Sequence, residues 1–296
     1  MRDADGSPVA QLTPAAAAAR AAFADVAPTP GALKPDPILV ASNVSRRFGG
    51  ILAVDVDHLE VQRGSITALI GPNGAGKTTF FNLMTGFDSP DTGDWSFNGR
   101  SMVGVAPHRM ASLGMVRTFQ LTKSLTKLPV IENMKLGATG QRGEKWWNGL
   151  FPMIWKAQEA EIEQRADDLL ARFNLAHMRD EYAGALSGGQ RKLLEMARAL
   201  MTNPTLVMLD EPMAGVNPVL KQSLNQHVRG LRDAGMSVLF VEHDMDMVHD
   251  ISDWVVVMAE GRLIAEGTPD QISSNPAVID AYLGTHQGQS LLEDEL

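Results

Sequence analysis

The run from Gly71 to Thr79 has the residue types and the spacing of a phosphate-binding loop. The letters GPNGAGKT fit the pattern G-x-x-x-x-G-K-[ST], and they follow directly after the apolar run Ile66–Ile70. Glycines let a loop turn so that successive backbone N–H groups point at phosphate oxygens, and a helix that starts there adds its positive end. We therefore expect a strand, a loop and a helix that hold a nucleotide by its phosphates.

The side chains of this loop predict ATP as the ligand, together with Mg²⁺. We expect Lys77 to reach the β- and γ-phosphates and the Thr78 hydroxyl to bind Mg²⁺. The loop residues predicted to contact ATP are Asn73, Gly74, Ala75, Gly76, Lys77, Thr78 and Thr79.

Two carboxylates follow a second apolar run, because Leu206–Leu209 ends in Asp210 and Glu211. Ligands of a parallel sheet gather at the carboxyl ends of its strands, so Asp210 is predicted to lie near the Mg²⁺ held by the loop. Glu211 points in a different direction and can act as a general base toward a water in line with the γ-phosphate. An acidic turn after a core strand is the plain alternative, but beside a phosphate loop the pair predicts ATP hydrolysis.

A third motif, Ser187–Gln190, lies about twenty residues before that strand. Ser187 is a good N-cap for a helix over Arg191–Leu200, and the two glycines leave backbone N–H groups free at its start. A helix start of this kind can bind phosphate, although a capped helix needs no ligand.

These three motifs and a later histidine stand in the order found in the nucleotide-binding subunits of ABC transporters, which the chain resembles over about residues 38–284. The resemblance implies an α/β fold, in which a P-loop NTPase core with a mixed sheet carries an inserted α-helical subdomain. It also implies pairing with a second ABC ATPase subunit, identical or different. The signature of each subunit then completes the ATP site of the other through Ser187, Gly188, Gly189 and Gln190.

The same resemblance assigns three further residues. Phe48 is similar to the aromatic residue that stacks on adenine, Gln120 to the glutamine that contacts Mg²⁺ or the attacking water, and His243 to the histidine that contacts the γ-phosphate. The implied catalytic residues are therefore Glu211, His243 and Gln120, and the implied Mg²⁺ ligands are Thr78, Gln120 and Asp210. In the loop that crosses to the opposite site, Asn217 stands where many members of the family have Asp, so this position brings no charge.

Several segments resemble one branch of the family, the ATPases of branched-chain amino-acid importers. The resemblance implies separate transmembrane permease subunits and an extracytoplasmic solute-binding protein as partners, with this chain peripheral on the cytoplasmic face of the cell membrane. It also implies that no pocket for the amino acid exists on the chain. The segments are Phe48–Gly50, Gly114–Gln120, Val130–Asn133, Ala214–Pro218 and Ala281–Gly284.

Three other functions stay open on the sequence alone. The ATPase of lipopolysaccharide export shares an Ala-Gly-Val before a proline but resembles the chain less around Arg117–Gln120. A soluble ABC ATPase acting on nucleic acid or ribosomes is disfavoured by the formal net charge of −9, since affinity for nucleic acid comes largely from basic residues. A P-loop kinase would leave the Ser187–Gln190 signature without a role.

Composition and patterning set the domain boundaries. Residues 1–37 are rich in Ala and Pro, and we expect a disordered extension with at most a brief helix. Residues 38–284 are predicted to form the ATPase domain, with a helical subdomain at about residues 121–186, and residues 285–296 an acidic tail. No apolar run approaches the length of a membrane-spanning helix, and the chain has no cysteine. The dense aromatic segment Trp146–Trp155 is expected to be either core or a docking patch.

Overall fold

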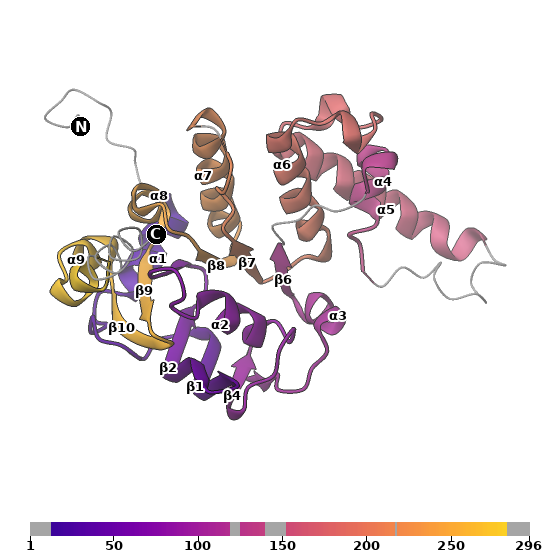
Figure 1. Cartoon of the computed structure of the whole chain (residues 1–296). Helices are drawn as coiled ribbons and strands as arrows, with labels where there is room; N and C mark the ends of the chain where they lie inside the picture. The colour runs from indigo at the N-terminus through magenta and orange to yellow at the C-terminus, as the bar shows by residue number, and fades with distance from the viewer. Residues whose placement is uncertain (1–12, 119–124, 140–151, 217, 283–296) are drawn as a thin grey trace, which may run out of the picture.

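A computed structural model describes residues 13–118, 125–139, 152–216 and 218–282 of the chain. Figure 1 shows two sheets with helices packed around them, and a group of helices to one side of the larger sheet. The predicted α/β fold with an inserted helical subdomain is confirmed.

The larger sheet is mixed and carries the phosphate loop. Within the described residues its strand order is β10-β9-β3-β8-β7-β6, parallel from β9 to β6, with β10 antiparallel at one edge. Parallel neighbours end at the same edge of a sheet, so the residues that follow β3, β8, β7 and β6 are gathered there. The strands are β3 (Ile66–Ile70), β6 (Met115–Thr118), β7 (Leu206–Asp210), β8 (Ser237–Val241), β9 (Trp254–Ala259) and β10 (Arg262–Gly267).

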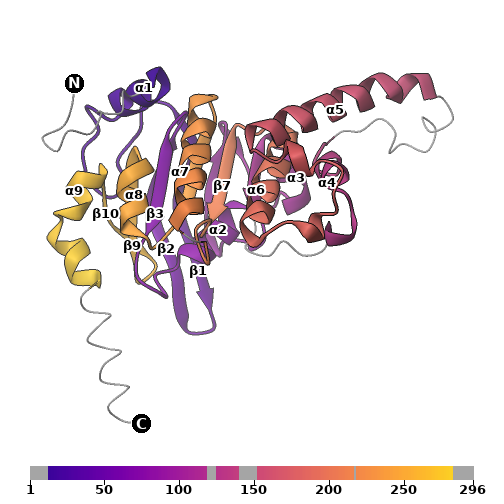
Figure 2. The ribbon, with the colours of Figure 1, turned by 90° about the horizontal axis from the view of Figure 1, so that it is seen from above.

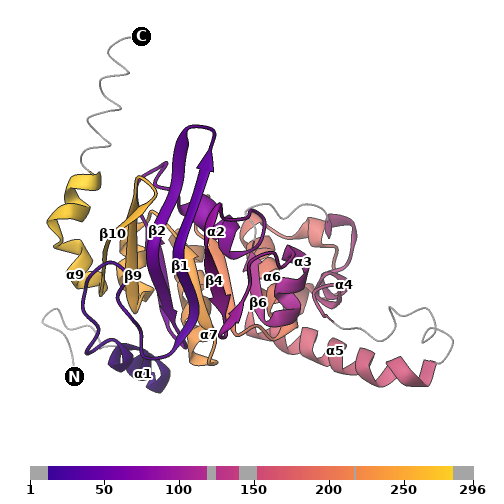
Figure 3. The same cartoon turned by 90° about the horizontal axis from the view of Figure 1, so that it is seen from below.

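The smaller sheet is antiparallel and covers one side of the molecule (Figure 3). Its order among the described residues is β2-β1-β4-β5, and its two long strands form a hairpin whose turn lies next to Phe48. The strands are β1 (Pro37–Phe48), β2 (Ile51–Gln62), β4 (Thr92–Phe97) and β5 (Arg100–Ser101).

Alternation along the strands divides the core between the two faces of the larger sheet. In β8, Val238 and Phe240 belong to one apolar cluster, whereas Leu239 and Val241 belong to the other. Both faces are buried, which explains why these strands are unbroken apolar runs in the sequence. The helix α2 (Lys77–Met84) packs into the cluster shared with the smaller sheet, and α7 (Pro218–Asp233) and α8 (Met245–Ile251) pack on the opposite face. The short α9 (Pro269–Ser273) follows β10.

A helical lobe lies beside the edge strand β6 (Figures 1 and 2). It contains α4 (Val130–Lys135), α5 (Pro152–Arg172) and α6 (Gly188–Ala199), which pack on one another, and a short helix α3 (Pro107–Met110) stands close by. The buried leucines of α6 join the same apolar cluster as α5 and the strands β3, β7 and β8, so the predicted subdomain bounds of about 121–186 stay a prediction. The described 3-10 turns are Ala111–Leu113, Leu125–Lys127, Ala176–Met178, Ala183–Ala185 and Leu200–Thr202.

The prediction of disorder is wrong for residues 13–37. Pro14–Ala22 forms helix α1, which Thr13 caps, and α1 packs against α7. The Phe23 ring stacks on Trp254 with 4.7 Å between the ring centroids, and the buried Lys34 ammonium lies 2.7 Å from Glu266. These partners stand more than 200 residues away in the chain, so the local composition gave no sign of them.

Some predictions lie outside the described residues. These are the structure of residues 1–12 and 285–296, and the positions of Gln120 and Asn217. The choice between core and docking for Trp146–Trp155 also stays open, because no side chain of that segment is described. Within the ranges the structure describes, no helix is long and apolar enough to cross a membrane.

Candidate nucleotide-binding site

The phosphate loop follows the fully buried strand β3 and opens α2, as the motif predicts. Gly76 caps the helix with φ of +98°, and a Cβ built on it would lie 2.3 Å from the Ala53 carbonyl oxygen. Only glycine can occupy such a position without moving the neighbouring backbone. Asn73 and Gly74 in the loop and Thr78 in the first helical turn are exposed, so the concave side of the loop is open to a ligand.

Lys77 folds back over the loop that precedes it. Its ammonium donates to the carbonyl oxygens of Gly71 at 2.7 Å and Pro72 at 2.9 Å. Burial lowers the pKa of Lys77, and the negative charge of Glu211 opposes that shift. The chain therefore holds a positive charge inside the curve of the loop and places the Glu211 carboxylate close enough to interact with it.

The end of β7 lies between the ends of β8 and β6 at the same edge of the sheet. Glu211 has φ of +46°, which is rare for a residue other than glycine, and its N–H donates to the Val241 carbonyl oxygen at 3.0 Å. This backbone turns sharply after Asp210, and both carboxylates line one small hollow at the end of the strand. Backbone strain of this kind concentrates at functional sites.

Glu242, at the end of β8, supports the turn after Glu211. Its buried carboxylate accepts from the Met213 N–H at 2.8 Å and from the His243 N–H at 3.2 Å. The His243 side chain is 64% exposed and stands at the rim of the site. Sequence reasoning assigned no role to Glu242, although a carboxylate directly after an apolar strand was a usable signal.

Arg117, on β6, also escaped the sequence analysis as a site residue. Its guanidinium lies 2.6 Å from the Asp210 carboxylate, and the two side chains are only 7% and 10% exposed. The partners are 93 residues apart, and only the pairing of β6 with β7 brings them together.

The Ser187–Gln190 signature opens α6 in the helical lobe, whereas the phosphate loop opens α2 in the core. Ser187 and Gln190 form a capping box: the Ser187 N–H donates to the Gln190 side chain at 2.9 Å, and the Ser187 Oγ accepts from the Gln190 N–H at 3.3 Å. Ser187 and Gly188 are exposed. The start of α6 is therefore held by its own capping box and exposed at the surface.

Lys192 joins α6 to the loop that follows Glu211. Its ammonium donates to the carbonyl oxygens of Pro212 and Ala214, and burial lowers its pKa against the charges of Glu242, Glu195 and Glu211. The same side chain lines a small hollow with Asp210 and Glu211. Lys192 thus connects the signature helix to the loop that follows the Asp210–Glu211 pair.

Phe48 ends β1 and is 49% exposed beside the turn of the hairpin. The Arg46 guanidinium lies over its ring, 5.0 Å from the centroid, and also pairs with Asp88 and Asp91. An aromatic ring that is supported by its own chain and open to solvent can stack on a base, and adenine stacking stays the predicted role of Phe48.

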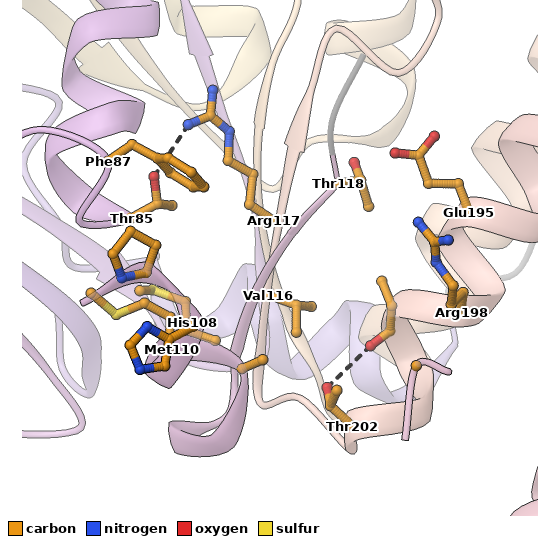
Figure 4. A pocket seen from close by; sticks show the side chains of 15 residues that line it. Thr85, Phe87, His108, Met110, Val116, Arg117, Thr118, Glu195, Arg198 and Thr202 are labelled. Atoms are coloured by element: carbon orange, nitrogen blue, oxygen red, sulfur yellow. Dashed lines mark hydrogen bonds between the residues drawn. The ribbon is translucent and has the colours of Figure 1, made fainter. Parts of the chain in front are cut away.

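A groove of about 500 Å³ separates the core from the helical lobe (Figure 4). Phe87 and Thr85 line it from the end of α2, His108 and Met110 from α3, and Glu195 and Arg198 from α6, with β6 as its floor. Thr118 and Glu195 also line the small hollow beside Asp210, so the groove reaches the edge of the predicted site.

Comparison with known proteins agrees with this arrangement. Residues 54–214 match the family described as ABC transporter, and residues 262–287 match the one described as branched-chain amino acid ATP-binding cassette transporter. The chain belongs to the ABC transporter family. As an ABC ATPase it binds and hydrolyses ATP, so the family and the activity predicted from the sequence are confirmed.

The chain covers nearly the whole length of similar proteins and solved structures. The probable branched-chain amino acid transport ATP-binding protein LivG of Archaeoglobus fulgidus is 42% identical over 85% of this chain and 97% of its own. The high-affinity branched-chain amino acid transport ATP-binding protein BraF of Pseudomonas aeruginosa is 41% identical over 84% and 98%. A crystal structure of an ABC cassette in its ADP conformation superposes with a TM-score of 0.74 at 38% identity, covering 84% of this chain and 99% of that one.

Proposed function

We propose that this ABC ATPase powers an importer of branched-chain amino acids. The proposal is carried by the edge of the larger sheet, where the phosphate loop, the Asp210–Glu211 pair and the residues after β8 come together. The names of the relatives and the match over residues 262–287 support the amino-acid branch, and neither lipopolysaccharide export nor a nucleic-acid or ribosomal ATPase gains such support.

Mg²⁺ fits the residues at this edge. The exposed Thr78 hydroxyl in the first turn of α2 and the Asp210 carboxylate supply the hard oxygen ligands that Mg²⁺ prefers, and this cation needs only one or two protein ligands beside phosphate and water. Bound Mg²⁺ would neutralise charge on the phosphates. Thr78 and Asp210 would hold it, and Gln120, which lies outside the described residues, is the third predicted ligand.

The chain's own residues would carry the rest of the reaction. The backbone N–H groups of the loop and the Lys77 ammonium would bind the phosphates, and Phe48 would stack on adenine. Glu211 would accept a proton from the attacking water, and His243 would contact the γ-phosphate.

We propose that the functional ATPase is a pair of subunits. The Ser187–Gln190 helix start is capped, exposed and placed in the other lobe from the phosphate loop, so it is suited to a nucleotide bound by a second subunit. The pair would bind two ATP molecules between them.

The groove is the proposed contact with a transmembrane permease subunit. Phe87 is 53% exposed on the wall of the groove, and Leu136, next to the lining residue Gly137, is 60% exposed. Exposed apolar side chains that are grouped in this way mark a surface that binds another protein. Docking there would hold the chain on the cytoplasmic face of the membrane, while an extracytoplasmic solute-binding protein delivers the amino acid.

Glu211→Gln tests the catalytic assignment. It keeps the shape of the side chain but removes the base, so we expect turnover to fall at least about a hundredfold. ATP binding should persist, and an ATP- and Mg²⁺-dependent pair should appear on gel filtration, with the natural partner subunit added if the two subunits differ. Glu260→Gln is a matched control, because Glu260 also has a positive φ (+51°) but follows β9 in an exposed turn.

Near-normal turnover in Glu211→Gln would remove Glu211 from the reaction. The transport assignment is tested separately, by uptake of labelled leucine into cells that carry the complete transporter. Uptake that persists with Glu211→Gln would show that this ATPase does not drive leucine import.

A further inference from the structure

Arg117 is shared by the groove and the predicted metal site. Its Nη2 donates to the Asp210 carboxylate at 2.6 Å, and the same side chain lines the groove wall beside Phe87 (Figure 4). Both members of the ion pair are nearly buried, so water screens their interaction little.

The other arm of the guanidinium is fixed by the helix that the phosphate loop opens. Its Nη1 donates to the Asn82 side chain at 2.7 Å and to the Thr85 hydroxyl at 3.2 Å. The cation also lies 5.7 Å from the ring centroid of Phe81 and 5.8 Å from that of Phe87. One planar side chain therefore connects the end of α2, the end of β7 and the groove.

We propose that Arg117 is a positioning residue for Mg²⁺: it holds one oxygen of Asp210 so that the carboxylate is oriented for the metal, and Phe87 in the groove braces it. This inference rests on the proposed role of Asp210 as a Mg²⁺ ligand. Carboxylates that bind metals are themselves hydrogen-bonded, and loss of such an outer partner typically lowers metal affinity 10- to 100-fold.

The planar shape of the Arg117 guanidinium is essential to this positioning role. Arginine presents several donors in one plane and can bond Asp210, Asn82 and Thr85 together, whereas lysine is a point charge with a single nitrogen. The opposite effect is also physically possible, because a cation beside Asp210 repels Mg²⁺. Replacing Arg117 separates the two: loss of positioning weakens Mg²⁺ binding, whereas loss of repulsion strengthens it.

The test measures binding and needs no turnover. The affinity of the full chain for a non-hydrolysable ATP analogue is measured by calorimetry with Mg²⁺ and with EDTA, and the ratio of the two affinities is the Mg²⁺ effect. For Arg117→Met we expect the Mg²⁺ effect to fall about tenfold or more, with the affinity in EDTA unchanged. Arg117→Lys should retain only part of the effect, and Phe87→Ala should reduce it in the same direction but less.

Arg198→Met is the matched control, because Arg198 lines the groove from α6 and has no contact with Asp210 in the described structure. Its Mg²⁺ effect should equal that of the unaltered chain. If Arg117→Met does not fold, Arg117→Lys and Phe87→Ala carry the test.

Three results would overturn the proposal. An unchanged or larger Mg²⁺ effect in folded Arg117 variants, with the affinity in EDTA unchanged, rejects the positioning role alone. An equal loss of affinity with Mg²⁺ and with EDTA assigns Arg117 a general structural role. No Mg²⁺ effect in the unaltered chain rejects the proposed metal site together with this inference.

Discussion

Two buried ion pairs lie in different regions of this chain, and their surroundings differ. Lys34 and Glu266 join the N-terminal segment to β10, with side chains that are 1% and 0% exposed. Arg117 and Asp210 lie at the sheet edge that also carries the phosphate loop, with side chains 7% and 10% exposed. Both pairs place opposite charges within 3 Å of each other, yet only one borders a site.

The Lys34–Glu266 pair is closed by the protein itself. Glu266 also accepts from the Gly31 N–H at 2.9 Å and the Trp254 indole at 3.0 Å, and Lys34 donates a further bond to the Ala32 carbonyl oxygen. Within the described residues, both oxygens of the Glu266 carboxylate have partners from the chain. Asp210, in contrast, lines a hollow together with Glu211 and Lys192. The Lys34–Glu266 pair is therefore enclosed by the chain, whereas the Arg117–Asp210 pair faces a hollow on its Asp210 side.

The largest effect is expected from breaking the closed pair. Lys34→Met leaves the Glu266 carboxylate without its cation in the core, and removal of one partner of a buried pair typically costs about 3–5 kcal/mol of the free energy of unfolding. ATP affinity should not change, because the pair lies away from the phosphate loop. Urea unfolding and nucleotide titration of the same sample measure both.

Lys135→Met is the control for this prediction. Its ammonium lies 3.2 Å from the Glu132 carboxylate and 3.9 Å from that of Glu163, both exposed, and a surface pair of this kind contributes less than about 1 kcal/mol. A loss of stability in Lys34→Met no larger than in Lys135→Met would contradict the structural role of the closed pair.

The closed pair also marks the limit of prediction from sequence. Residues 13–37 have the composition of a disordered segment, but their stability comes from Phe23 on Trp254 and Lys34 on Glu266, contacts that no local pattern records. The phosphate loop was predictable because its strand, turn and helix are consecutive, so one stretch of sequence specifies the whole geometry.

The remaining site residues fall between these cases. Asp210 and Glu211 were predicted from the strand that they end, and the structure puts that strand at the same sheet edge as the phosphate loop. Sequence analysis included Arg117 only within the family-like segment Gly114–Gln120 and gave it no role. Its partner Asp210 stands on a neighbouring strand, and its other partners, Asn82 and Thr85, lie at the end of α2. Pairing order between distant strands is the information that the sequence lacked.

A smaller loss of stability is expected from breaking the open pair. In Arg117→Met the Asp210 carboxylate stands beside a hollow and can recover hydration, so we expect a loss of about 1–3 kcal/mol, the range for a hydrogen-bonding group left unsatisfied. Urea unfolding without nucleotide, beside Lys34→Met, measures the difference. A loss equal to that of Lys34→Met would show that both pairs are equally closed, and the distinction drawn above would fail.

The smallest effect concerns a half-buried histidine at the contact between the end of α5 and α7. His227 on α7 stacks on Phe173 at the end of α5, with 4.5 Å between ring centroids and an angle of 20° between planes. Burial lowers the pKa of His227, and the nearby Arg172 charge lowers it further. The unfolded chain therefore takes up a proton near pH 6.5, whereas the folded chain takes it up only at lower pH. Stability contributed by neutral His227 is present above pH 6.5 and is lost as the pH falls below it.

His227→Phe keeps the stacking and removes the titrating group, so the free energy of unfolding should fall less between pH 7 and pH 5 than in the unaltered chain. The exposed His108→Phe is the control and should leave the slope as it is. Urea unfolding at several pH values decides, and equal slopes in the His227→Phe chain and the unaltered chain would mean that this ring is as free to take up a proton in the folded state as in the unfolded one.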